Sequence, residues 1–324
     1  MVDWVGDAGV ATAARYRDMG EHQVRGISPS YERLSLGVAD DPAVLRLLDT
    51  LPPAKRQPNL LLAAVRFLAG PIASYPEFRS FVLDRWDELS ATMLARRTQT
   101  NEASRCTATM LVLAALPQPL ALLEVGASAG LCLQPDRYAY RYGDRPVLGD
   151  SPLILSCRTT GAVPVPRRLP EVVWRRGLDL NPLDVRDADE MRWLRSLVWP
   201  EQTDRFAVLD KAIALARTDP APIVCGDLTT DLVALAATAP RNATLVIYHS
   251  AVLSYLDADG RARFRETVRA IAAERPTAWI ANEGPGVCVP YESPPGPVPF
   301  VLSRDGVALA RTSPHGDWID WLDP

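Results

Sequence analysis

One short segment carries most of the chemistry that the sequence suggests. Residues 122–131 read Leu-Leu-Glu-Val-Gly-Ala-Ser-Ala-Gly-Leu, an apolar run followed by small residues. Small residues let the backbone turn sharply and let a ligand approach the main chain and the start of a following helix. The spacing is E-x-G-x-x-x-G rather than the dinucleotide pattern G-x-G-x-x-G, which disfavours a nicotinamide or flavin enzyme. The segment therefore predicts a ligand-binding turn built from Glu124, Gly126, Ser128 and Gly130.

The same segment resembles the first motif of class I S-adenosylmethionine-dependent methyltransferases. The resemblance implies that the loop passes under the amino acid end of the cofactor, with Glu124 near its ammonium group. The letters also spell G-x-S-x-G, which would make Ser128 the nucleophile of a serine esterase-like hydrolase with His315 as base. A hydrolase elbow normally follows several strands and an HGGG-type segment, and neither is evident before residue 120. A glycine turn that only packs a helix on a strand is a third interpretation.

Polar residues also follow the later strand-like runs, and ligands in open α/β sheets bind at the carboxyl ends of strands. A carboxylate after the second strand can bind both ribose hydroxyls, and one after the third can bind the adenine amino group. Asp179 and Asp227 occupy those positions in order, so we predict them as cofactor ligands. His249 follows the next strand and is the candidate catalytic base when the acceptor carries a proton, with Ser250 as a substrate contact.

A polar segment interrupts the otherwise apolar N-terminal region. Helix capping explains some of its residues but leaves several long polar side chains without a role. We therefore expect the segment to lie against the glycine loop and to help form an acceptor pocket. The substrate-binding candidates that it contributes are Gln99, Asn101, Glu102 and Arg105.

Hydrophobic periodicity divides the chain into two parts. Residues 1–118 carry helical spacing throughout, and from residue 119 short apolar runs alternate with helical stretches. The fold expected for 119–324 is α/β, with a Rossmann-like, methyltransferase-type, mostly parallel sheet and a β-rich insertion at about 137–170. A hairpin over 300–310 should lie at its antiparallel end. The predicted parallel strands are Leu120–Val125, Val172–Leu180, Ile223–Cys225, Thr244–Tyr248 and Ala278–Ala281.

Four segments together resemble a bacterial family known only as domain of unknown function 2332. These are 123–131, 177–185, 193–200 and 248–253, with 98–102 as a fifth point of similarity. The resemblance covers nearly the whole chain and implies no established reaction. One feature departs from common methyltransferases, in which about twenty residues separate the glycine loop from the ribose acid. The separation between Gly130 and Asp179 is much longer, which makes Asp144 a rival for the ribose position.

Composition limits the class of protein. The chain has 324 residues, 48% of them hydrophobic, with a formal net charge of −4, which is typical of a globular protein and disfavours nucleic acid as a partner. The five scattered cysteines and the lack of His clusters predict reduced thiols and no metal site. The acidic N-terminus and the absence of long apolar runs predict a cytoplasmic protein without membrane contact. We therefore expect an S-adenosylmethionine-binding protein that acts on a small molecule as a methyltransferase. The alternatives are the serine esterase-like hydrolase and a non-catalytic ligand-binding protein. The sequence does not determine the oligomeric state.

Overall fold

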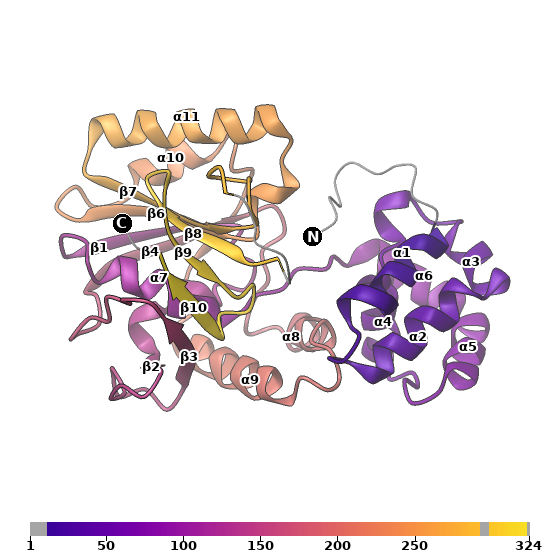
Figure 1. Ribbon diagram of the computed structural model, residues 1–324. Coiled ribbons are helices and arrows are strands. Elements are labelled where there is room, and N and C mark those ends of the chain that lie inside the picture. The colour runs from indigo at the N-terminus through magenta and orange to yellow at the C-terminus, as the bar shows by residue number, and fades with distance from the viewer. Residues whose placement is uncertain (1–11, 292–297, 323–324) are drawn as a thin grey trace. The chain divides into compact units, whose positions relative to one another are not determined.

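The computed structural model describes residues 12–291 and 298–322 (Figure 1). The acidic N-terminal stretch used above to predict localisation lies outside these residues. The described residues form two compact units. One contains residues 12–100 together with Arg186–Ala207, and the other contains Asn101–Val185 and the described residues from Val208 onward. Within the described ranges, no helix is both long and apolar enough to cross a membrane.

The first unit is helical, as the periodicity of residues 12–95 predicts. Its helix starts follow local capping chemistry: the Asp41 carboxylate accepts hydrogen bonds from the Ala43 and Val44 amides, and Pro42 occupies the first helical position. The helices of this unit that precede the sheet are α1 (Thr12–Asp18), α2 (Pro29–Ala39), α3 (Pro42–Leu48), α4 (Pro58–Phe67), α5 (Tyr75–Asp84) and α6 (Trp86–Ala95).

Helix α8 (Ala188–Ser196) belongs to the helical unit although it lies between two strands in the chain. Its Trp193 is 1% exposed and packs edge-on against Phe67, with ring centroids 5.6 Å apart. The Trp193 indole also donates to the carbonyl of Arg97. Residues 186–207, which periodicity assigns to the α/β part, therefore complete the core of the helical part. The following helix is α9 (Thr203–Thr218).

The second unit is built on a ten-stranded, mostly parallel sheet. The five predicted parallel strands are confirmed, with changes of one or two residues at their ends. They lie in the order β5-β4-β1-β6-β7, so the chain extends the sheet from β1 in both directions. Their bounds are β1 (Leu120–Val125), β4 (Val172–Asp179), β5 (Ile223–Cys225), β6 (Thr244–Ser250) and β7 (Thr277–Glu283).

The remaining strands continue the sheet beyond β7. The predicted hairpin is present as β8 (Phe300–Arg304) and β9 (Val307–Thr312), both antiparallel to their neighbours. It is not the end of the sheet, because β10 (Trp318–Trp321) pairs with β9 and then with β3 (Ile154–Thr160). β3 in turn pairs with β2 (Ala139–Tyr142). The β-rich stretch expected as an insertion is therefore the far edge of the same sheet.

Helices cover both faces of the strands. On one face, α10 (Leu232–Ala237) and α11 (Ala258–Glu274) bury apolar side chains against β1, β6 and β7 (Figure 1). On the other, α7 (Cys106–Leu113) contacts β3, β7 and β8, and the Tyr142 hydroxyl of β2 donates to the Thr107 carbonyl. Every residue of α7 is buried, which explains its sequence of apolar residues and two threonines. Strands from one edge and from the middle of the sheet thus pack against one helix.

This burial predicts a large effect of shortening a side chain of α7. Leu111 is 1% exposed, so Leu111→Ala should lower the free energy of unfolding by about 2–5 kcal/mol through lost burial and a residual cavity. Val233→Ala, at a helical position that is 54% exposed in α10, should change it by less than about 0.5 kcal/mol. Urea unfolding followed by circular dichroism measures both, and a Leu111→Ala protein of wild-type stability would contradict the central position of α7.

Candidate functional site

The glycine loop after β1 has an unusual backbone. Gly126, Ser128 and Gly130 all have positive φ angles, of 70°, 50° and 71°. This region is readily available to glycine and costly for serine, so Ser128 is held in a strained conformation. The Gly126 amide donates to the Leu178 carbonyl of β4, and the Gly130 amide donates to the Ala127 carbonyl. The predicted sharp turn is therefore present, and its strain marks it as a candidate functional segment.

Neighbouring side chains pack closely on both glycines. A Cβ atom at Gly126 would lie 2.3 Å from Val252 Cγ2, and one at Gly130 would lie 3.1 Å from Ile223 Cδ1. Close packing within the chain thus requires glycine at position 126 before any ligand is considered. Val252 lies just after β6, so the segment that follows β6 borders the glycine loop.

No α-helix follows the loop, contrary to the expectation of a helix start at this point. The chain instead makes two short 3₁₀ turns, Leu131–Leu133 and Pro135–Arg137, because Pro135 has no amide hydrogen with which to continue a helix. Buried side chains bind the backbone carbonyls that a helix would have satisfied. These carbonyls are those of Leu131, Cys132, Leu133 and Pro135, which accept from Tyr138, Tyr248, Arg175 and Tyr140 respectively.

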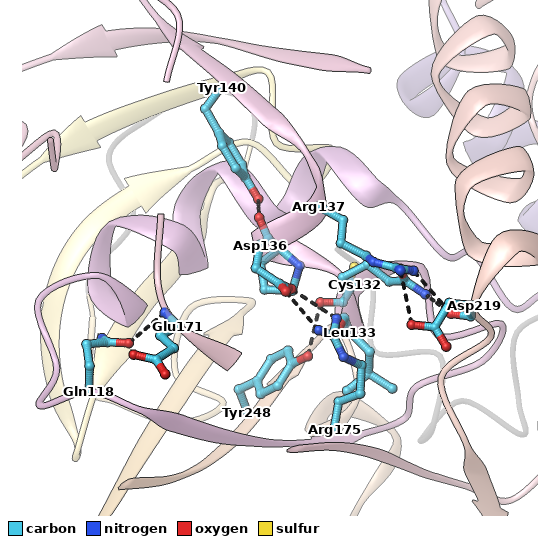
Figure 2. A network of polar contacts seen from close by, with 12 residues as sticks. Gln118, Cys132, Leu133, Asp136, Arg137, Tyr140, Glu171, Arg175, Asp219 and Tyr248 are labelled. Atoms are coloured by element: carbon cyan, nitrogen blue, oxygen red, sulfur yellow. Dashed lines mark hydrogen bonds and ion pairs between the residues drawn. The ribbon is translucent and has the colours of Figure 1, made fainter. Parts of the chain in front are cut away.

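Figure 2 shows part of this network. Arg175 of β4 also forms two hydrogen bonds to the Asp136 carboxylate, at 2.8 and 2.9 Å, and both residues are largely buried. Arg137 pairs with Asp219 at 3.0 Å on the outer side of the same segment. The irregular chain between β1 and β2 is therefore anchored at nearly every residue, which gives the glycine loop a rigid support.

Glu124 is the most unusual ionisable residue of the site. It is the penultimate residue of β1, is 4% exposed, and its Oε2 atom has no hydrogen-bond partner among the described residues. Burial raises the pKa of Glu124 well above its ordinary value, and the negative potential of Cys132 and Asp179 raises it further. A buried polar atom without a partner is rare and costly, so it is a candidate for a ligand contact.

Arg105 is the nearby cation. It is 6% exposed, and its guanidinium donates to the carbonyls of Pro314 at 2.9 Å and Ser250 at 3.3 Å. Burial lowers the pKa of Arg105, while the charges of Glu124 and Glu283 oppose that shift. No carboxylate of the described residues lies within ion-pair distance of it. A buried guanidinium therefore lies near two buried carboxylates without direct contact.

Asp179 ends β4 and acts directly on the glycine loop. Its Oδ2 accepts from the Ser128 amide at 2.8 Å, and its Oδ1 accepts from the Asn181 amide at 2.7 Å. The carboxylate thus binds the strained residue of the loop, next to the predicted site. Asp144, its rival, is exposed and follows β2, with six strands between β2 and β1 in the sheet order. The geometry favours Asp179.

Asp227 follows β5, the outermost parallel strand. Its Oδ1 accepts from the amide and the hydroxyl of Thr229, and these bonds lower the pKa of Asp227. Its own amide donates to Asp231. Asp227 therefore organises the turn before α10, and its role toward adenine stays a prediction.

The polar segment before α7 lies against the glycine loop, as expected. Asn101 Oδ1 accepts from the Leu131 amide at 2.8 Å, and the Glu102 carbonyl accepts from the Cys132 thiol at 3.2 Å. The Glu102 carboxylate lies 3.5 Å from His315 Nδ1. Gln99 belongs to the helical unit, so its position is described only relative to the other residues of that unit. The contribution of these residues to an acceptor pocket stays a prediction.

His249 has no free nitrogen for the predicted role of catalytic base. It is fully buried; its Nε2 accepts from the Trp279 indole at 2.9 Å and its Nδ1 lies 2.7 Å from Glu283 Oε1. Its ring also packs edge-on against Phe264 of α11. These contacts favour a structural role for His249. Its ring points into the core although the residue lies near the end of β6.

Glu283 is the site residue that sequence reasoning missed. It is 1% exposed at the last position of β7, beside the end of β6. The predicted strand ended at Ala281, so the acid two residues later did not appear as a strand-end group. Applying the strand-end criterion to the segment Asn282-Glu283-Gly284 would have found it.

Taken together, the fold and site define an α/β protein with one open parallel half-sheet and a cluster of buried charged groups at its carboxyl edge. Residues 13–321 match the family described as an uncharacterized protein conserved in bacteria (DUF2332), and the chain belongs to that family. No curated protein matches the chain. The family membership predicted from the sequence is thereby confirmed.

The structural roles of the two candidate ribose acids, Asp179 and Asp144, can be distinguished by their effects on the free energy of unfolding. Asp179→Ala should lower the free energy of unfolding by about 1–3 kcal/mol, because two backbone amides lose a charged acceptor. Asp144→Ala should have no measurable effect, since its side chain is exposed. Urea unfolding of both variants measures this difference, and equal stabilities would show that Asp179 does not support the loop.

Proposed function

We propose that this protein binds S-adenosylmethionine and is a methyltransferase acting on a small molecule. The observation that carries the proposal is the buried carboxylate of Glu124, without a partner for Oε2, at the end of the strand that leads into the glycine loop. An acid at this position matches the sequence motif. An ammonium group is a donor that could bind the unpartnered Oε2 atom of Glu124.

The strand order supports the same proposal. The chain leaves β1 toward β4 and β5 on one side and later toward β6 and β7 on the other, so the topology reverses between β1 and β6. Open α/β sheets bind ligands outside the carboxyl ends of strands at such a reversal. Glu124 is the penultimate residue of β1, Ser250 ends β6, and Ala251 follows it. Ala251 has a φ of 61°, so strained residues follow both strands at the reversal.

The residues of the site fit the cofactor as follows. Glu124 would bind the ammonium group and Arg105 the carboxylate of its amino acid end, which gives each of these buried groups a partner. Asp179 would hold the ribose side, and Asp227 would hold the adenine. When bound, S-adenosylmethionine supplies a methyl group on a sulfonium, which an acceptor takes by displacement.

The protein's own part in such a reaction is positioning. Asn101, Glu102 and Ser250 border the glycine loop or the end of β6 and are the residues proposed to orient the acceptor. Buried tyrosines beneath the loop keep water from its backbone and hold it in one conformation. Binding and orientation, rather than proton transfer by His249, are the contributions that these contacts favour.

The hydrolase alternative rests on Ser128. Its strained backbone is compatible with a nucleophile, but its Oγ atom has no hydrogen-bond partner among the described residues. A serine nucleophile requires a base within hydrogen-bond reach. His249 is engaged by Glu283 and Trp279, and His315 lies beside Glu102. Between residues 12 and 119 the chain also contains no strand that could precede the elbow.

Calorimetry with S-adenosylmethionine and S-adenosylhomocysteine tests the proposal. We expect binding of both, and a thermal shift equivalent to about 2.7 kcal/mol at a hundredfold excess over the dissociation constant.

Ser128→Ala should weaken binding by only about 0.5–1.5 kcal/mol, because at most one hydrogen bond is lost. An organophosphonate should leave Ser128 unmodified. A covalent adduct on Ser128 together with no cofactor binding would establish the hydrolase instead, and binding without methylation of any acceptor would favour the non-catalytic alternative.

Glu124→Gln tests the buried carboxylate through pH. The folded protein retains a proton on Glu124 that the unfolded chain releases as the pH rises through about 4.5, so the wild-type free energy of unfolding should fall above that pH. Glutamine is neutral at every pH and should remove this decline, stabilising the protein by about 1–3 kcal/mol at pH 7. The same variant should bind S-adenosylhomocysteine about tenfold or more weakly. Urea unfolding between pH 5 and 8 and calorimetry measure the two effects; parallel pH profiles would contradict the raised pKa.

A further inference from the structure

Glu283 concentrates three hydrogen bonds on one oxygen. Its Oε1 atom lies 2.7 Å from His249 Nδ1 and accepts from the amides of Val252 at 2.8 Å and Leu253 at 3.1 Å. The residue is 1% exposed, and its Oε2 atom has no partner among the described residues. One buried carboxylate therefore binds both strand β6 and the segment that follows it.

The indole of Trp279 determines the tautomer of His249. A tryptophan Nε1–H can only donate, so His249 Nε2 must accept and the ring proton must lie on Nδ1. That proton then points to Glu283 Oε1. Trp279, His249 and Glu283 thus form a directed chain of hydrogen bonds that begins inside the apolar core and orients the carboxylate.

The segment held by Glu283 borders the glycine loop. Ala251 takes a left-handed conformation with a φ of 61°, and the next residue, Val252, places Cγ2 2.3 Å from where a Cβ of Gly126 would lie. A left-handed alanine is strained and persists only where the surroundings determine it. The two amide bonds to Glu283 directly after Ala251 are the contacts that maintain this conformation.

We propose that Glu283 is the positioning residue of the candidate cofactor site. Through Oε1 it holds residues 251–253 so that the Val252 side chain packs against Gly126 of the glycine loop. The inference rests on the proposed function for the identity of the ligand, but the positioning itself is a property of this segment. Under this proposal, His249 and Trp279 orient the Glu283 carboxylate.

A pair of variants tests the proposal. Glu283→Gln keeps an oxygen that can accept from the same three donors, so it should retain S-adenosylhomocysteine affinity within about threefold and wild-type amide hydrogen exchange at residues 252 and 253. Glu283→Ala removes the acceptor; it should raise exchange at these amides at least about tenfold and weaken binding at least about tenfold. Glu274→Ala, at an exposed acid ending α11, is the matched control and should change neither.

Calorimetry and mass-spectrometric hydrogen exchange separate the possible failures. If the wild type does not bind the probe, the proposed function fails, and exchange at residues 252 and 253 still reports on positioning. If Glu283→Ala binds normally although these amides exchange faster, or if exchange is unchanged, the positioning proposal is overturned. Should Glu283→Ala not fold, Val252→Ala provides the second test, because it removes the side chain that packs against Gly126 without removing the buried carboxylate. Unaltered affinity in that variant would also overturn the proposal.

Discussion

The irregular chain between β1 and β2 imposes the constraint on which the rest of the unit depends. Residues 126–137 are mostly buried and form no α-helix, so several of their amides and carbonyls find no partner within the segment. Each needs a partner from elsewhere, because an unpaired backbone group in the interior is costly. The tyrosine hydroxyls, the Arg175 guanidinium and the carboxylate of Asp179 meet this need. Several elements of the sheet are thereby tied to a single loop.

This dependence explains the unusual distribution of buried polar residues. Tyr248 of β6 and Arg175 of β4 direct polar atoms to the same short turn, although they lie on different strands. Arrangements of this kind make a loop rigid, since each bond restrains a separate carbonyl. A rigid glycine loop suits a protein that must present backbone groups to a ligand in one geometry.

The buried ionisable groups at the carboxyl edge of the sheet differ from this network, because they do not pair with one another. Glu124, Arg105 and Glu283 are all buried, yet neither carboxylate reaches ion-pair distance of the guanidinium. Separated buried charges reduce stability compared with apolar residues of the same size. Proteins retain such groups where binding requires them, and a ligand with both an ammonium and a carboxylate would give each charge a partner. Under the proposed function, the site therefore gives up stability for ligand recognition.

Much of the second unit could be predicted because its signals are local. An apolar run bounded by proline or glycine defines a strand such as β1, and Asp41 before Pro42 defines a helix start. The buried helix α7 is evident from its mostly apolar residues. Pairing partners are not local: the hairpin strand β9 meets β10, and β10 meets β3, through contacts that no periodicity encodes.

The sequence by itself determined the parallel strands, the family and, apart from Glu283, the acids at the ends of those strands. Only the tertiary structure decided which of those groups are available for chemistry. The sequence predicts His249 as a base, but Trp279 and Glu283 bond to its two ring nitrogens. Among the described residues, Glu124 and Glu283 each have one carboxylate oxygen without a partner. The physical reason is that a side chain's hydrogen bonds and burial depend on donors and acceptors from distant segments, whereas helices, strands and turns depend mainly on neighbouring residues.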